Sequence, residues 1–228
     1  MKLEFFSEDV EMPDFDKEKA KSWIENTAKN ENKIILLDSG NYESYWHKNK
    51  EWTPDKFRSI LESNCYNMAF NFDYQNLQGS IDDIADIIIS TTIKDQEKAT
   101  DSIVMPIIHT QKEMIAYVAA KVVETIEPEM IAIPERNLGE GLLERVKILH
   151  QIRNTLNNLG YYCPIHLLGT DSPLSILLFS LFGADSFDGL LWCVTTADYD
   201  TGLLHHFHQS QRNCPKSCPK DQWFRQDW

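Results

Sequence analysis

The stretch CPIHLLGTDSPLSILLFSLFGADSFD, residues 163–188, contains the pattern that decides the fold. Its apolar run from Cys163 to Leu168 predicts a buried strand. Ser172-Pro173 follows, and a hydroxyl residue before a proline is typical of the first turn of a helix. The apolar helix that begins there ends near Gly183, and a second short strand ends at Asp188. This succession of strand, helix and strand predicts a parallel pair joined by a helical crossover.

The same unit repeats along the chain. Apolar runs that predict buried strands begin 32, 37, 27 and 33 residues apart, at Ile34–Leu37, Tyr66–Phe72, Ile103–Ile108, Met130–Ile133 and Cys163–Leu168. The segments between them carry helix signals: a start at Thr53-Pro54, a capping box at Thr110 and Glu113, and a periodic segment over Gly139–Leu159 that Gly160 stops. A strand followed by a helix, repeated about every 30 residues, predicts parallel strands with helical crossovers.

Two architectures are built this way: a (β/α) TIM-like barrel and an open doubly wound sheet. We favour the α/β barrel, because no Gly-rich dinucleotide-binding or phosphate-binding motif follows any predicted strand. A complete barrel takes about 250 residues, and the chain has 228. We therefore expect a shortened or incomplete barrel over residues 1–193. Residues 194–228 are expected to form a small Cys-containing extension, with a hairpin that turns at Ala197–Gly202.

The chain is acidic, since 35 Asp and Glu residues outweigh 22 Lys and Arg and give a formal net charge of −13. This balance argues against a general electrostatic attraction to nucleic acid and leaves a local basic patch as the alternative. No apolar run reaches the length of about 18 residues that a membrane-spanning helix needs. The acidic start, MKLEFFSEDVEMPDFD, lacks the form of a signal peptide, and the five cysteines do not have the pattern of a disulfide framework. We therefore expect a cytoplasmic protein.

Polar residues follow the predicted strands at the positions where a barrel has its active site. They are Asp38, Asp73, His109, Glu135, Arg136, Asp171 and Asp188. A single Asp after a strand is more often a turn or cap residue, and Glu135 with Arg136 is equally typical of a solvated pair. Recurrence at equivalent positions favours a shared site. Two carboxylates about 5 Å apart perform retaining glycosyl transfer, one as nucleophile and one as acid and base. The pattern leaves open which pair this would be.

Several of these motifs resemble those of the tRNA-guanine transglycosylase family. His166–Pro173 followed by Gly183–Asp188 resembles the family's Gly-rich loop and its Gly-x-Asp-x-Phe-Asp motif. Leu37–Tyr42 resembles the family's Asp-Ser-Gly-Gly-Phe-Gln motif. Ala69–Asp73 resembles the segment that reads the target base, and Leu138–Glu140 resembles the end of the loop that covers it. The motifs occur in the family's order across residues 33–193.

The resemblance implies a modified (β/α) barrel that exchanges guanine in tRNA, or in DNA in a related branch, for a 7-deazaguanine base. It implies that Asp188 attacks C1′ of the target nucleoside and that Asp38 acts as acid and base. Asp73 would accept hydrogen bonds from guanine, and His109 stands where the family has a Gln that contacts the base. The implied base-binding set is Asp73, His109, Ser39, Gly40, Glu135 and Arg136. The implied partners are a nucleic acid, a guanine or 7-deazaguanine base, and a second subunit in a homo- or heterodimer.

The chain also departs from the family pattern. Pro134-Glu135-Arg136 replaces a Gly-Gly-Leu loop, Asn41-Tyr42-Glu43 replaces Gly-Phe-Gln, and the N-terminal strands and later helices are mostly missing. The family's structural Zn²⁺ site would fall on Cys214 and Cys218, completed by upstream histidines at positions 205, 206 and 208; two reduced thiols in a tail are the alternative. The departures leave two other functions open. One is a non-catalytic barrel subunit that pairs with a catalytic partner, and the other is a nucleoside or glycoside hydrolase that uses water.

Overall fold

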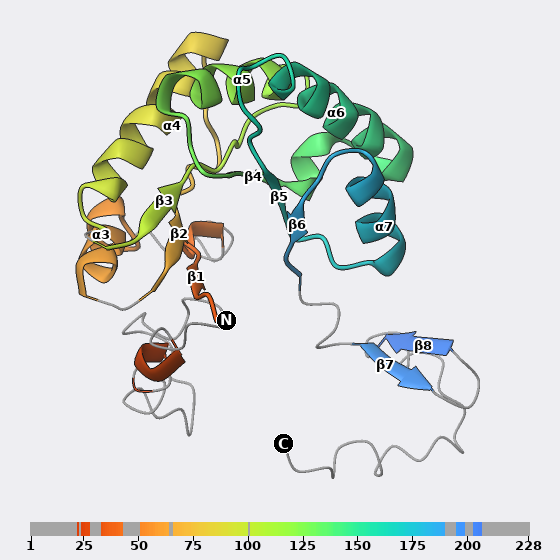
Figure 1. The fold of residues 1–228 in the computed structure, drawn as a ribbon, viewed down its shortest axis with the longest axis horizontal. Helices are drawn as coiled ribbons and strands as arrows, with labels where there is room; N and C mark the ends of the chain where they lie inside the picture. The colour runs from red at the N-terminus through yellow and green to blue at the C-terminus, as the bar shows by residue number, and fades with distance from the viewer. Residues whose placement is uncertain are drawn as a thin grey trace.

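The computed structural model describes residues 22, 24–27, 33–42, 51–63, 66–99, 101–189, 195–198 and 203–206. Strands and helices alternate in this part of the chain (Figure 1). The parallel strands are β1 (Leu36–Leu37), β2 (Met68–Phe70), β3 (Ile103–Met105), β4 (Ile131–Pro134), β5 (Ile165–Leu168) and β6 (Ser186–Phe187). The helices between them are α3 (Pro54–Ser63), α4 (Ile81–Gln96), α5 (Ile115–Ile126), α6 (Gly141–Leu156) and α7 (Pro173–Leu181). The predicted alternation of strand and helix is confirmed.

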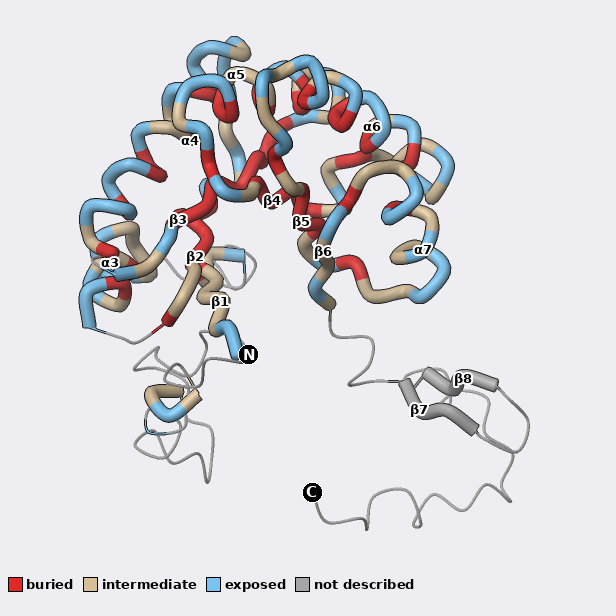
Figure 2. Tube along the Cα trace, in the orientation of Figure 1, coloured by how far each residue is buried: buried red, intermediate tan, exposed pale blue. Residues whose placement is uncertain are grey.

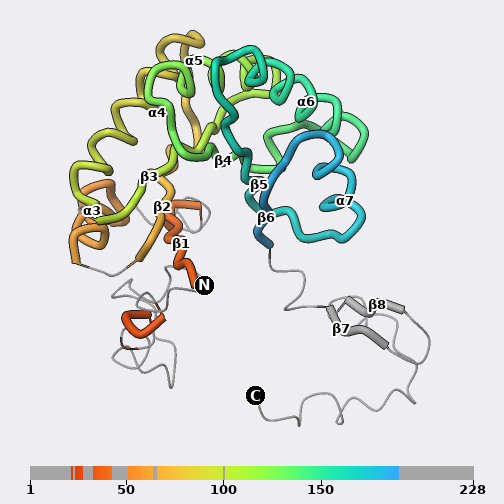
Figure 3. Tube along the Cα trace, viewed as in Figure 1, coloured from red at the N-terminus to blue at the C-terminus, as the bar shows by residue number. Residues whose placement is uncertain are grey.

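The strands pair in the order of the chain. β1, β2 and β3 form one parallel sheet, and β4, β5 and β6 form another. A parallel bridge between Ile107 and Ala132 joins the two sheets. Next to it, the Ile108 N–H donates to the Ala132 carbonyl at 2.8 Å, and the Ala132 N–H donates to the Pro106 carbonyl at 2.9 Å. Figure 3 shows the resulting steady progression from β1 to β6. An open doubly wound sheet reverses its strand order at a switch point, so the described strands do not have that architecture.

The six strands line the inner side of a curved arc, and α3 to α7 lie along its outer side (Figure 1). Phe70 in β2 and His166 in β5 meet on the inner side, with their ring centroids 5.2 Å apart. Strands three places apart in a flat sheet are separated by roughly 14 Å, so this contact requires strong curvature. Within the described residues β1 and β6 each pair with one strand, and the strands therefore form an open arc and not a closed barrel.

Side chains alternate between the two faces of the arc, as successive residues of a strand do. The outward side chains of β4 and β5 pack against the helices in the largest apolar core: Ile131, Ile133, Ile165 and Leu167. The inward side chains form a smaller apolar cluster: Phe70, Met105, Ile107 and Ala132. Figure 2 shows the buried residues along the strands and on the facing sides of the helices, whereas the outer helix surfaces are exposed. Burial on both faces explains why the strands read as continuous apolar runs.

Helix starts at the two prolines are confirmed, whereas the capping box predicted at Thr110 is wrong. α3 begins at Pro54 and α7 begins at Pro173. α5 begins only at Ile115, and its N-cap residue Met114 makes no side-chain cap hydrogen bond. The Thr110 hydroxyl is buried and has no hydrogen-bond partner among the described residues. The segment between β3 and α5 is therefore a loop, which lies beside the candidate site described below.

A capping box does open α4, where the sequence analysis identified none. The Ser80 hydroxyl accepts from the Asp83 N–H at 3.2 Å, and the Asp83 carboxylate accepts from the Ser80 N–H at 2.9 Å. α6 is shorter than predicted, since it ends at Leu156 with Asn157 as its C-cap. A 3₁₀ turn, η2 (Glu135–Leu138), precedes it directly after β4.

The hairpin predicted in the C-terminal extension is confirmed. β7 (Thr195–Asp198) and β8 (Leu203–His206) pair antiparallel, with Asp198 opposite Leu203. The division of the chain at residue 193 stays a prediction. Of the helices in the described ranges, none is both long enough and apolar enough to cross a membrane.

Candidate functional site

Polar side chains gather at the carboxyl ends of the parallel strands, which we call the rim. Each of the six strands is followed there by at least one polar residue that the sequence singled out: Asp38, Asp73, His109, Glu135 with Arg136, Asp171 and Asp188. Because all six strands run parallel and in chain order, these carboxyl ends lie on the same edge of the arc. The rim is the place where a (β/α) architecture forms its active site.

Asp73 and His109 form the most buried pair of the rim. Asp73 Oδ1 lies 2.9 Å from His109 Nδ1, and 9% of each side chain is exposed. The second carboxylate oxygen, Oδ2, accepts from the Gln75 amide. The carboxylate is thus already bonded on both oxygens, so a ligand that bonded to Asp73 Oδ2 would share that oxygen with the Gln75 amide or replace it. The imidazole ring of His109 is fixed by the carboxylate, which sets the direction of its other nitrogen.

The loop after β1 is hydrogen-bonded to the same segment. The Asn41 amide donates to the Asp73 carbonyl at 2.5 Å, and the Ser39 hydroxyl accepts from the Asp73 N–H at 3.5 Å. Gly40 has a φ of 68°, a left-handed conformation that favours glycine and turns the loop at this point. Asp38, at the start of the loop, accepts from the Ser39 N–H at 2.8 Å. The structure therefore brings the loop of Ser39, Gly40 and Asn41 next to Asp73, with Asp38 at the start of that loop.

Arg136 connects the ends of three strands. Its guanidinium donates to the Gln75 side chain and lies over the Tyr42 ring, 4.4 Å from the centroid. A guanidinium above an aromatic ring is attracted by the negative face of that ring. Arg136 thus closes a chain of contacts that runs through Gln75 and Asp73 to His109.

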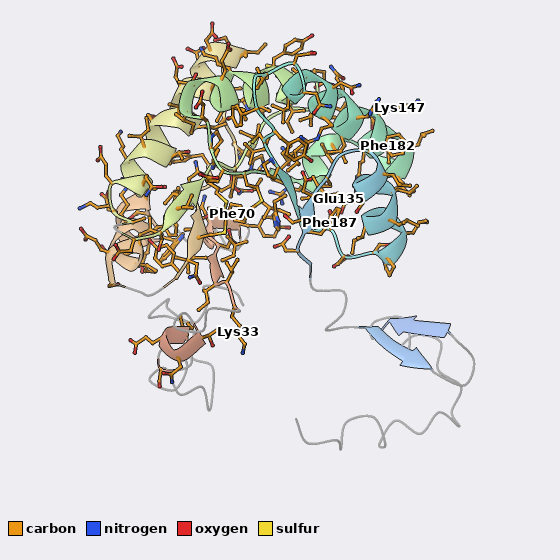
Figure 4. All side chains as sticks on the ribbon, in the orientation of Figure 1. Lys33, Phe70, Glu135, Lys147, Phe182 and Phe187 are labelled. Atoms are coloured by element: carbon orange, nitrogen blue, oxygen red, sulfur yellow. The ribbon has the colours of Figure 1, made fainter. Side chains whose placement is uncertain are left out.

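Glu135 has a different set of partners, so the interpretation of Glu135 and Arg136 as a pair with each other is wrong. Its carboxylate accepts from Arg145 and from the Thr170 hydroxyl, the latter at 2.9 Å. The side chain is 13% exposed and lies on the inner side of the arc in Figure 4. Through Thr170, Glu135 joins the end of β4 to the loop after β5.

Asp188 is the exposed carboxylate of the rim, with 55% of its side chain accessible. Its Oδ1 accepts from the Gly169 N–H at 2.6 Å, and the same oxygen lies 3.8 Å from His166 Nε2. An accessible carboxylate held by a backbone amide is chemically able to act as a nucleophile. Asp38 and Asp188 follow the first and last strands of the arc, so the two predicted catalytic carboxylates lie at its two ends.

A cavity of about 590 Å³ opens beside the Asp73–His109 pair. Three rim residues, Gln75, His109 and Arg136, line it together with the loops after β2, β3 and β4. The three predicted catalytic and base-reading carboxylates do not line it. The cavity therefore lies at the part of the rim that holds Asp73 and His109 and not at the Asp188 end. Its volume is sufficient for a small-molecule ligand.

The structure adds site residues that the sequence analysis did not select. His166 lies within β5, and its polar ring interrupts a buried apolar run, which was the available signal. Gln75 and Thr170 link the rim through side-chain hydrogen bonds, and nothing in their spacing distinguishes them from ordinary loop residues.

The predicted zinc ligands Cys214 and Cys218, and His208 upstream of them, lie outside the described residues, and zinc binding stays a prediction. The candidate site is therefore defined by the rim alone. Compared with known proteins, the chain matches no protein-family model and no curated protein sequence.

Proposed function

We propose that the chain is a transglycosylase-like enzyme that exchanges guanine in a nucleic acid for a 7-deazaguanine base. The observation that carries the proposal is the rim: polar side chains that follow β1, β2, β3 and β4 are joined in one hydrogen-bonded series around the Asp73 carboxylate, from Asn41 to Arg136. The sequence motifs that resemble the transglycosylase family fall on this series and on Asp188. We further propose that the arc is an incomplete (β/α) barrel, because its strand order and its filled inner side are those of a barrel.

The proposed reaction begins with Asp188. One carboxylate oxygen of Asp188 forms a bond to C1′ while the bond from C1′ to the guanine nitrogen breaks, and protonated Asp38 gives its proton to the departing base. The step requires the nucleoside to reach both carboxylates, which follow the last and the first strand of the arc. Asp38, now a carboxylate, then takes a proton from the incoming base. The nitrogen of that base forms the new bond to C1′, and the ester bond to Asp188 breaks. Both carboxyl groups return to their starting protonation states, as they do in a retaining glycosyl transfer.

Recognition of the base is proposed for Asp73. Adjacent N–H donors of guanine suit a carboxylate, which accepts charge-assisted hydrogen bonds. Since Gln75 occupies one oxygen of Asp73, we expect the base to displace the Gln75 amide when it binds. His109 and Arg136, which line the neighbouring cavity, would then contact the remaining edge of the base.

The experiment is incubation of the purified full chain with radiolabelled guanine and, separately, with tRNA and double-stranded DNA. Label in one polymer is the expected result, and its loss in Asp188→Asn assigns the nucleophile. The matched control is Asp86→Asn, the same chemical change at an exposed carboxylate of α4 that contacts Lys121. Label transfer that survives in Asp188→Asn would contradict the proposed mechanism. Release of free guanine without incorporation would instead favour the hydrolase.

A second candidate is a non-catalytic subunit that completes its barrel with a partner chain. The observation that favours it is the open arc, whose described edge strands β1 and β6 have one neighbour each. Unpaired strand edges are frequent sites of association. Light scattering of the chain with and without a transglycosylase partner tests this candidate. A monomer that transfers label by itself would exclude it.

A further inference from the structure

His166 lies in the middle of β5 on the inner side of the arc. In register, Ala132 of β4 and Ser186 of β6 flank it, and Phe70 of β2 contacts its ring. The side chain is 5% exposed. Nδ1 lies 2.8 Å from the Ser186 hydroxyl, whereas Nε2 is buried without a hydrogen-bond partner. A buried polar atom that has no partner is rare and requires an explanation.

The group that faces Nε2 is the carboxylate of Asp188. The distance from Nε2 to Asp188 Oδ1 is 3.8 Å. This distance is too long for a hydrogen bond but within the range of an ion pair. Phe70, Ala132 and Ser186, which surround the ring from the other strands, are uncharged. Within the described residues Asp188 is therefore the charged group that the imidazole faces. A shift of the Asp188 carboxylate oxygen by about 1 Å would bring the two atoms to hydrogen-bonding distance.

The contacts of Ser186 indicate which nitrogen of the neutral ring carries the proton. The Ser186 hydroxyl lies 3.6 Å from the Met130 sulfur, which is a hydrogen-bond acceptor. Nδ1 is the nearer of the two acceptors, at 2.8 Å. A hydroxyl that donates to Nδ1 leaves the proton of the neutral imidazole on Nε2. The neutral ring then presents Nε2–H to the Asp188 carboxylate.

We propose that His166 is a positioning residue, which holds the Asp188 carboxylate through Nε2–H in the orientation needed for attack. The proposal rests on the proposed function, since it assigns the attack to Asp188. It explains why an imidazole is placed within an apolar strand and why its Nε2 atom is left without another partner. Burial lowers the pKa of His166, and the neighbouring Asp188 charge opposes that shift. The charge state of the ring thus depends on the charge of Asp188.

The first test is an NMR titration of the full chain labelled with ¹⁵N-histidine. The signal of His166 is assigned by its loss in His166→Gln, and its titration is compared in wild type, Asp188→Asn and the control His150→Gln. His150 is exposed on α6 and is bonded to Asn154. We expect the pKa of His166 to fall further in Asp188→Asn and to stay unchanged in His150→Gln. A pKa of His166 that is the same in Asp188→Asn as in wild type would overturn the proposal.

The second test separates contact with Asp188 from contact with Ser186. A Gln amide at position 166 reaches the place of Nε2, whereas an Asn amide reaches the place of Nδ1. We expect His166→Gln to keep most of the kcat of label transfer and His166→Asn to lose it roughly tenfold or more, with KM unchanged in both. Equal losses in the two variants would indicate a structural contribution alone and overturn the proposal. Absence of label transfer in wild type would overturn the proposed function, and the titration would still decide whether His166 responds to Asp188.

Discussion

The Asp73 carboxylate and the His109 imidazole lie at neighbouring strand ends, with Oδ1 and Nδ1 2.9 Å apart and both side chains 9% exposed. The other carboxylate oxygen binds Gln75, which in turn binds Arg136. Both partners line the cavity, but His109 is buried, whereas Gln75 is partly exposed. Because Gln75 is the more exposed of the two partners, we expect a ligand to exchange with Gln75 at Oδ2 and not with His109 at Oδ1.

Asp73→Asn is expected to raise the KM for guanine ten- to hundredfold in the label-transfer assay. The reason is that a hydrogen bond to a charged group contributes about 1.5–3 kcal/mol. Initial rates measured against guanine concentration test this. Gln75→Ala is the comparison, since it removes the competitor and keeps the carboxylate, and its KM should not rise. An unchanged KM in Asp73→Asn would remove Asp73 from the base-binding set.

The pH dependence of stability is expected to change when His166 is replaced. Burial lowers the pKa of His166 below its ordinary value of 6.5, so the unfolded chain binds this proton more readily than the folded chain. The stability that the neutral ring contributes is present above about pH 6.5 and is lost as the pH falls toward the folded-state pKa. Urea midpoints between pH 5 and pH 8 should therefore fall less steeply in His166→Gln than in wild type. Parallel curves for the two proteins would show that the ring titrates equally in both states.

Asp95→Ala is expected to destabilise the fold by about 3–5 kcal/mol, because it removes the buried carboxylate bound to Arg58 Nε and leaves the buried Phe72 N–H without its acceptor. Asp95 is fully buried and accepts from Arg58 at 2.8 Å and from the Phe72 N–H at 2.7 Å. Asp55 is a control on the same arginine, at 3.0 Å but with 92% of its side chain exposed. Asp55→Ala should cost about 1 kcal/mol or less. Equal urea midpoints for the two variants would contradict this distinction.

Cys163 is expected to resist alkylation in the native protein. Its side chain is buried, and burial raises the pKa of the thiol to about 11, so the reactive thiolate is scarce at neutral pH. Mass spectrometry of the Cys163 peptide after iodoacetamide treatment at pH 8 measures this. Modification should appear only when urea unfolds the chain. Rapid labelling without urea would show that the β5 end of the core opens readily.

The strands could be predicted from the sequence because the arc buries both of their faces. The runs at Ile131–Pro134 and Ile165–Leu168 are apolar at nearly every position. A strand of this composition is stable where both of its faces are covered, as in a parallel sheet with helices. Helix starts were predictable where proline fixes the backbone, as at Pro54 and Pro173. Thr110 misled the prediction because the loop before α5 follows tertiary contacts, including the bond from the Asn137 amide to its carbonyl.

The site was predictable only in its outline. Strand ends could be counted along the chain, which placed Asp38, Asp73 and Asp188 on one rim. The partners of these carboxylates could not be predicted. Gln75 and His166 face them because of their side-chain orientation and burial in the folded chain, and a sequence pattern does not show either property. The curvature of the arc could likewise not be predicted, because it depends on interior contacts such as that of Phe70 with His166.

The order in which the strands pair has a consequence for synthesis on the ribosome. Each strand contacts its predecessor, so a newly made unit finds its partner already present. The rim contacts are similarly local, since Asp73 and His109 are 36 residues apart, Glu135 and Thr170 are 35 apart, and Gly169 and Asp188 are 19 apart. The arc can therefore grow from its N-terminal side as the chain emerges. Asp188 is the last of these residues to leave the ribosome, so the proposed nucleophile is added to a rim whose other members already have their partners.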